Sequence, residues 1–172
     1  GVEVIASQAF MQSYRGGSVL ETVSFPSTMK RIESLAFRQS SLTSVTLPPH
    51  TTFGTSVFDI SKKLASVTIP EGVEALGDYM FWSCEALTEI AFPDSLKTVG
   101  ESCFGHTGLT KIDLNKVETL GSYAFYICSG LTPPRQPRSA RQSLPITPIS
   151  RRSRSRTAAG PSARSCSAAT TP

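Results

Sequence analysis

A motif of about 22 residues recurs throughout this chain, and its fixed period constrains the fold more than any other feature. The copy at residues 64–87 reads LASVTIPEGVEALGDYMFWSCEAL, and related copies occupy residues 20–42, 42–64, 87–109 and 109–131. Repeats of this length form solenoids, in which each unit buries its apolar face against its neighbours. The sequence therefore predicts a β-rich repeat solenoid.

The first half of each unit predicts one short strand, because it reads Leu-x-x-(Val/Ile)-x-(Leu/Ile/Phe) and is usually followed by Pro. Side chains alternate between the faces of a strand, and successive strands joined by a long crossover pair in parallel. Proline ends the strand because it cannot donate a hydrogen bond. The face predicted to lie in the core carries Val23, Phe25, Val45, Leu47, Val67, Ile69, Ile90, Phe92, Ile112 and Leu114.

The second half of each unit contains two apolar residues and then a Phe, and we expect turns or short 3-10 segments there. The recurring aromatic residue predicts a stacked spine of Phe37, Phe58, Phe81, Phe104 and Phe125. The unit at 42–64 is weaker, since Thr51 or Thr52 takes the first apolar position. Residues 1–10 align with the back half of a unit, which is the pattern expected of a piece of a longer array. Residues 11–19 are interpreted as a loop insertion.

This pattern resembles the BspA-like leucine-rich repeat family, and the resemblance covers residues 1 to about 132. The residues that carry it are Ile69-Pro70, Leu76-Gly77, Phe81, Cys84 and Leu87, and again Leu120-Gly121, Ala124-Phe125, Cys128 and Leu131. The resemblance implies a curved array of short strands. It also implies an adhesive or protein-binding role, at the cell surface or in secreted form, although residues 1–10 do not read as a signal peptide.

Charge and composition divide the chain near Thr132. Residues 1–132 carry nine Lys and Arg and thirteen Asp and Glu, whereas residues 133–172 carry eight Arg and no acidic residue. The second segment has almost no large apolar residue, so we expect a solenoid at 1–132 and a disordered basic tail at 133–172. The Arg/Ser run at 151–156 supports an alternative function, that of an intracellular scaffold or nucleic-acid-associated protein. No apolar run approaches the roughly 18 residues that a membrane span needs.

The cysteines are interpreted as buried packing residues. Cys84 and Cys128 follow the spine Phe by three residues, where other units carry Ser13, Ser40, Ser61 or Thr107. They lie two units apart, about 10 Å at the usual strand spacing, whereas disulfide Cα atoms lie within roughly 7 Å.

Motifs for catalysis, metal binding and cofactor binding are absent from the sequence, so we expect a non-enzymatic protein without a cofactor. Cys103 and His106 are the one nearby pair of a nucleophile and a base.

The strand face opposite the core is the candidate ligand surface. It is either a solvated sheet face or a binding surface for a protein or glycan, since solenoids commonly bind on an extended face. Binding of nucleic acid would instead involve the tail. Tyr79, Trp82, Tyr123 and Tyr126 flank the spine and either cover the edge of the core or form exposed anchors. The candidate ligand residues are Thr22, Ser24, Ser44, Thr46, Ser66, Thr68, Glu89, Lys111 and Asp113.

Overall fold

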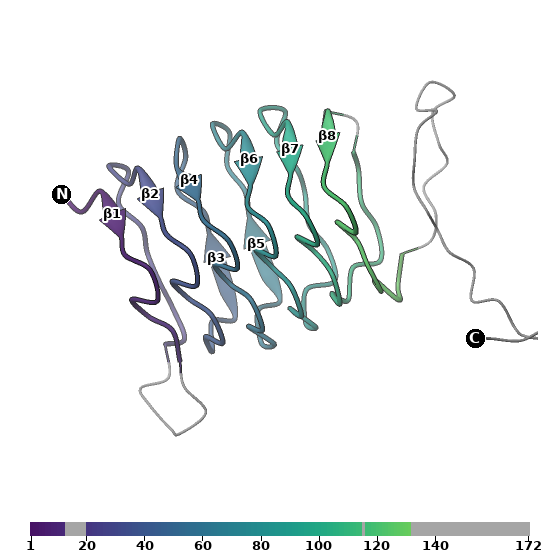
Figure 1. Cartoon of the computed structure of the whole chain (residues 1–172), viewed down its shortest axis with the longest axis horizontal. Coiled ribbons are helices and arrows are strands. Elements are labelled where there is room, and N and C mark those ends of the chain that lie inside the picture. Colours follow the sequence, from purple (N-terminus) through teal and green to yellow (C-terminus); the bar gives the residue numbers. More distant parts are fainter. Residues whose placement is uncertain (13–19, 115, 132–172) are drawn as a thin grey trace, which may run out of the picture. The chain divides into compact units, whose positions relative to one another are not determined.

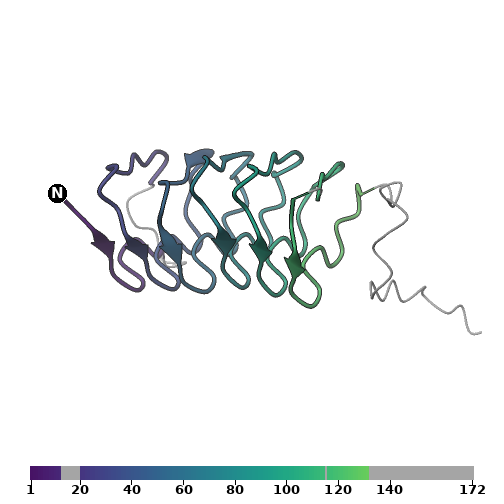
Figure 2. The same cartoon turned by 90° about the horizontal axis from the view of Figure 1, so that it is seen from above.

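The computed structural model describes residues 1–12, 20–114 and 116–131, which wind into a solenoid of stacked units (Figures 1 and 2). The predicted repeat fold of parallel strands is confirmed. The described residues contain no helix, and hence none long and apolar enough to cross a membrane. The strands are β1 (Val4–Ile5), β2 (Arg31–Ile32), β3 (Ser44–Thr46), β4 (Thr52–Phe53), β5 (Ser66–Thr68), β6 (Ala75–Leu76), β7 (Thr98–Val99) and β8 (Thr119–Leu120).

Two rows of strands run along the solenoid. We call the row predicted from the sequence the front row, although it lies behind the other row in the view of Figure 1. In this row β3 pairs in parallel with β5, and Val45 lies beside Val67. The back row was expected to consist of turns, but it contains two parallel three-stranded sheets, β1-β2-β4 and β6-β7-β8. Each back strand ends on the second apolar residue of its unit, as at Ile32 and Leu76.

The front row is shorter than the sequence predicted, since residues 22–25, 89–92 and 111–114 form no strand. Both β3 and β5 read Ser-Val-Thr. The corresponding residues of the last two units are Glu-Ile-Ala and Lys-Ile-Asp, and Glu, Lys, Ala and Asp are poor strand formers.

The predicted Phe spine is confirmed. Ring centroids of successive spine residues, from Phe10 to Phe125, lie 5.2–5.5 Å apart with nearly parallel planes. The rings of the four central members are fully buried: Phe37, Phe58, Phe81 and Phe104.

The turns around each spine Phe contain left-handed residues that are not glycine. Leu35 and Gln39, two residues before and after Phe37, have φ of 63° and 60°, and the pattern repeats along the array. This conformation costs roughly 1–2 kcal/mol for an L-residue. It points the N–H groups of Leu35, Phe37 and Gln39 at carbonyls of the next unit, at 2.8–3.0 Å. The strain is therefore offset by three hydrogen bonds at each interface between units.

The position three residues after the spine Phe requires a small hydrogen-bond donor. Ser61 Oγ, Cys84 Sγ and Cys128 Sγ each donate to the carbonyl of the spine Phe in the preceding unit, at 3.2, 3.4 and 3.0 Å. This explains why Ser and Cys interchange there. Cys84, Cys103 and Cys128 are all free thiols, and Ser13 lies outside the described residues.

The weak unit keeps the core closed through Thr51. Its side chain is buried, and its hydroxyl donates to the carbonyls of Met29 and Pro49 at 3.0 and 3.1 Å. Thr52 is exposed, so Thr51 occupies the apolar position.

Replacing Phe81 by Ala tests the spine. Phe81 stacks on Phe58 at 5.5 Å and on Phe104 at 5.4 Å, so Phe81→Ala should lower the free energy of unfolding by about 3–5 kcal/mol. Urea denaturation followed by circular dichroism measures this loss. The control Tyr123→Ala removes a side chain that is 63% exposed and should cost less than about 1 kcal/mol. Equal losses of unfolding free energy in both variants would contradict the conclusion that the spine stabilises the fold.

Alkylation tests the placement of the thiols. Burial raises the pKa of the Cys84 and Cys103 thiols, so the reactive thiolate forms only at higher pH than usual. At pH 9, where an ordinary thiol of pKa about 8.5 is mostly ionised, iodoacetamide should leave both unmodified until denaturant is added. Mass spectrometry of the digested protein reports the labelling. Labelling of the folded protein at the rate of the unfolded one would show that these positions are open to solvent.

Candidate functional site

The front face displays the side chains that the sequence predicted on its outside. All nine candidate ligand residues are exposed, whereas Val45 and Val67, which alternate with them, are buried. The β3–β5 pairing sets Ser44 beside Ser66 and Thr46 beside Thr68. In the described part of the chain these four hydroxyl groups make no hydrogen bond. Their donors and acceptors are thus available to a ligand.

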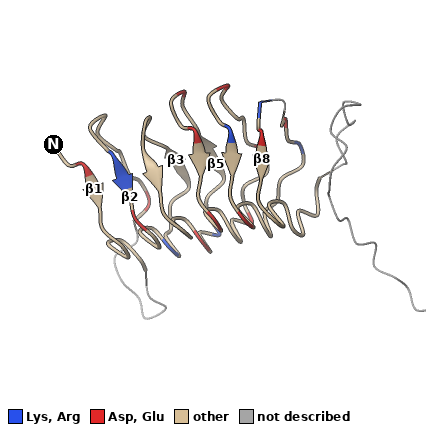
Figure 3. Ribbon diagram, turned by 45° about the horizontal axis from the view of Figure 1, so that its top comes forward, with Lys and Arg blue, Asp and Glu red and all other residues tan. Residues whose placement is uncertain are grey.

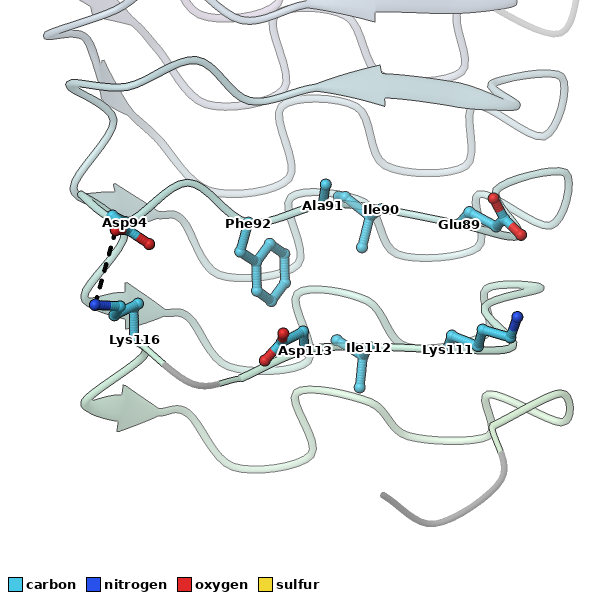
Figure 4. Close-up of a pocket in the computed structure, with 9 residues that line it drawn as sticks. All are labelled: Glu89, Ile90, Ala91, Phe92, Asp94, Lys111, Ile112, Asp113 and Lys116. Carbon is cyan, nitrogen blue, oxygen red and sulfur yellow. Dashed lines mark ion pairs between the residues drawn. The ribbon is translucent and has the colours of Figure 1, made fainter. Parts of the chain in front are cut away.

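The structure divides this face into two regions of different character. The strands β3 and β5 contain no charged residue (Figure 3), and their outward Ser and Thr side chains form what we call the hydroxyl region. Beyond β5, residues 89–92 and 111–113 enclose a groove of about 540 Å³. Three candidate residues, Glu89, Lys111 and Asp113, line this groove (Figure 4).

An ion pair closes one end of the groove. Lys116 Nζ lies 3.7 Å from Asp94 Oδ2, and both side chains are largely exposed (Figure 4). The carboxylate of Glu71 in the preceding unit accepts hydrogen bonds from the backbone N–H groups of Asp94 and Ser95, each at 3.1 Å. The bond from Asp94 is the main reason that the pKa of Glu71 is lowered. Glu71 in this way orients the turn that carries Asp94.

The floor of the groove is apolar. Ile90, Phe92 and Ile112 are half-buried, and the Phe92 ring packs 5.8 Å from that of Phe104 in the spine. The sequence placed these three residues on the core side but did not predict the groove. Its one signal was the change from Ser and Thr to residues such as Glu89 and Ala91, which disfavour strand pairing.

The aromatic residues flanking the spine form a cluster on the turns of the last units. The Trp82 ring lies 4.7 Å from His106 and 6.4 Å from Tyr126. Gly105 makes room for the indole, since a Cβ there would lie 2.3 Å from it. Trp82 and Tyr79 are half-buried, whereas Tyr123 and Tyr126 are 63% and 45% exposed. Of the four aromatic residues, these two are therefore the ones placed to act as anchors.

Cys103 and His106 do not form a nucleophile–base pair. Cys103 is fully buried and its pKa is raised, which opposes thiolate formation, while His106 packs against Trp82 and Tyr126. Among the described residues, no group of three or more His, Cys, Asp and Glu side chains could hold a metal ion. The Arg/Ser run at 151–156 lies outside the described residues.

Solved leucine-rich repeat proteins share this architecture. The T. pallidum leucine-rich repeat protein TpLRR is 32% identical with a TM-score of 0.57, and the match covers 60% of this chain and 50% of that one. A leucine-rich repeat protein from Bacteroides ovatus, at 23% identity and a TM-score of 0.51, covers 76% and 45% and shares the fold. The chain thus spans about half the length of these relatives. No curated protein matches it.

The repeat pattern also matches a family as a whole. Residues 2–132 match the BspA type leucine rich repeat region in six copies, the same number as the partial first unit and the five full units described above. More than half of the chain is covered. The chain belongs to the BspA-type leucine-rich repeat family.

Proposed function

We propose that the chain is a non-enzymatic binding module that presents its front face to a protein or glycan partner. The observation that carries this proposal is the row of exposed side chains in fixed register, of which Ser44, Thr46, Ser66 and Thr68 have hydroxyl groups without a partner in the described chain. Membership of a leucine-rich repeat family supports a binding role.

The mechanism of binding is preorganisation. The spine and the bonds between units fix the backbone beneath the front face, so the exposed side chains are already spaced for contact. A ligand that fits them avoids much of the entropy cost of ordering a flexible surface. Many weak contacts along an extended face then add up to affinity.

The setting that we propose is a larger protein of the surface or adhesion type. The resemblance of residues 1 to about 132 to the BspA-like family supports this location. The alternative, association with nucleic acid through the basic tail, depends on residues outside the described part of the chain.

An array of extracellular matrix proteins and glycans tests the binding role. The full chain should bind at least one array member, and Thr68→Arg should weaken that binding at least tenfold, because the long charged side chain covers the centre of the front face. Surface plasmon resonance measures the affinity. Thr119→Arg is the matched control, since Thr119 is an exposed Thr on β8 in the back row, and it should leave the affinity within about twofold.

Two outcomes would contradict the proposal. One is an array without a binder. The other is a ligand whose affinity falls equally in both variants, which would place the binding surface elsewhere.

A further inference from the structure

We propose that the aromatic cluster on the turns of the last three units is a second binding surface, which takes an arginine-containing basic peptide segment of a partner protein. The turns are residues 77–87, 100–109 and 121–131. None of the cluster residues belongs to the front face, so this inference does not depend on the proposed function. The cluster consists of Tyr79, Trp82, His106, Tyr123 and Tyr126.

The first support is the continuity of the rings across three units. The ring centroids of Tyr79 and Tyr126 lie 5.8 and 6.4 Å from that of Trp82. His106, in the unit between, lies 4.7 Å from Trp82 and 5.6 Å from Tyr126, and Tyr123 lies 5.7 Å from Tyr126. Tyr123 and Tyr126 are exposed and the other three rings are half-buried. The five rings therefore form one connected surface that a ligand can reach.

The second support is that packing does not require aromatic residues here. The position directly after the spine Phe holds Trp82 and Tyr126 in these units, but Arg38 and Asp59 in earlier ones. In the unit between, Gly105 holds this position, and a Cβ there would collide with the indole of Trp82. The fold thus accepts charged residues and Gly where the cluster has rings. The rings are therefore available for binding, and Gly105 gives the indole a fixed place before a ligand arrives.

The third support is the negative charge around the cluster. The three turn segments contain no Lys and no Arg, and their charged residues are Asp78, Glu85 and Glu101. Lys62 of the preceding unit pairs with Glu85 at 2.8 Å, whereas in the described chain no cation pairs with Asp78 or Glu101.

Glu101 is joined to the cluster by a hydrogen bond. The Tyr79 hydroxyl donates to Glu101 Oε1 at 2.8 Å, and the Glu101 backbone N–H donates to Asp78 Oδ1 at 2.7 Å. Both acidic residues are exposed. Two carboxylates are therefore held at the edge of the aromatic surface.

Rings and carboxylates together favour a cationic ligand. A cation over an aromatic face is attracted by the ring, most strongly by that of Trp. Arg suits such a surface best, because its planar guanidinium stacks on aromatic rings and also pairs with carboxylates. A segment with several Arg residues can therefore stack on Tyr126 and Trp82 and pair with Glu101. A neutral glycan would stack on the rings but would gain nothing from the charge.

The fluorescence of Trp82 tests the location of binding, because Trp82 is the only tryptophan of the chain. A seven-residue peptide of alternating Gly and Arg should change its emission when added to the full chain. The Kd is measured by fluorescence anisotropy of the labelled peptide. The same peptide with citrulline in place of Arg keeps the planar group without its charge, and should bind at least tenfold more weakly. Added salt should weaken binding of the Arg peptide.

Two variants separate the contribution of the rings from that of the charge. Tyr126→Leu keeps the apolar contact but removes the aromatic face, and should weaken binding about fivefold. Glu101→Gln keeps an acceptor for the Tyr79 hydroxyl but removes the charge, and should weaken binding about threefold. Glu74→Gln is the matched control, since it removes the same charge directly before β6 in the back row, and should change the Kd less than about 1.5-fold. Circular dichroism verifies that the variants keep their fold.

Several results would overturn the inference. They are an unchanged Trp82 emission with the Arg peptide, equal binding of the Arg and citrulline peptides, and equal effects of Glu101→Gln and Glu74→Gln. A change of emission with a neutral oligosaccharide such as maltohexaose, but not with the Arg peptide, would overturn it in favour of a glycan. None of these results bears on the front face, whose role is tested by Thr68→Arg.

Discussion

Stacking of consecutive units through their turns is the interaction on which the rest of this structure depends. Spine rings 5.2–5.5 Å apart fill the interior, and the left-handed residues on either side direct three N–H groups at each interface to the next unit. Neither device suffices alone, because a left-handed L-residue is strained and a ring without a neighbour leaves a cavity. Together they set one spacing between units, and the front and back rows inherit it.

The sequence predicts those parts of the fold that depend on burial. Val45 and Val67 alternate with polar residues, and the spine Phe recurs once per unit, as a packed interior requires. The position of Cys84 is occupied by Ser in other units, which indicates a small packing residue. The left-handed turns were not predictable in this way. Residues such as Leu35 and Tyr79 give no local turn signal, because their conformation is imposed by bonds to the next unit rather than by their own preference. The back strands were not predicted for a similar reason. Each is only two residues long, which is too short to show an alternation of apolar and polar residues in the sequence.

The exposure of the candidate ligand residues was predictable to the same extent. Alternation fixes which side chains point outward, so all nine residues are exposed as expected. Whether neighbouring segments pair depends on two segments at once, and the sequence of either one does not determine it. The groove is a consequence of that missing pairing, and the substitution of Glu89, Ala91 and Asp113 for Ser and Thr indicated a change of charge rather than an open edge.

The residues that pack the interior are different from those exposed on the front face. A solenoid of this kind can therefore hold a binding site at little cost in stability. Phe81 and Cys84 look like a chemical cluster in the sequence, but each is occupied with contacts inside the array. Ser66, Thr68 and Ala91 have no such contacts, so changing them leaves the interior intact. The spine restricts how far units can spread, because each ring is held between two others. A ligand of the front face must therefore fit the surface that already exists, and the free energy of its contacts is not spent on rearranging the units.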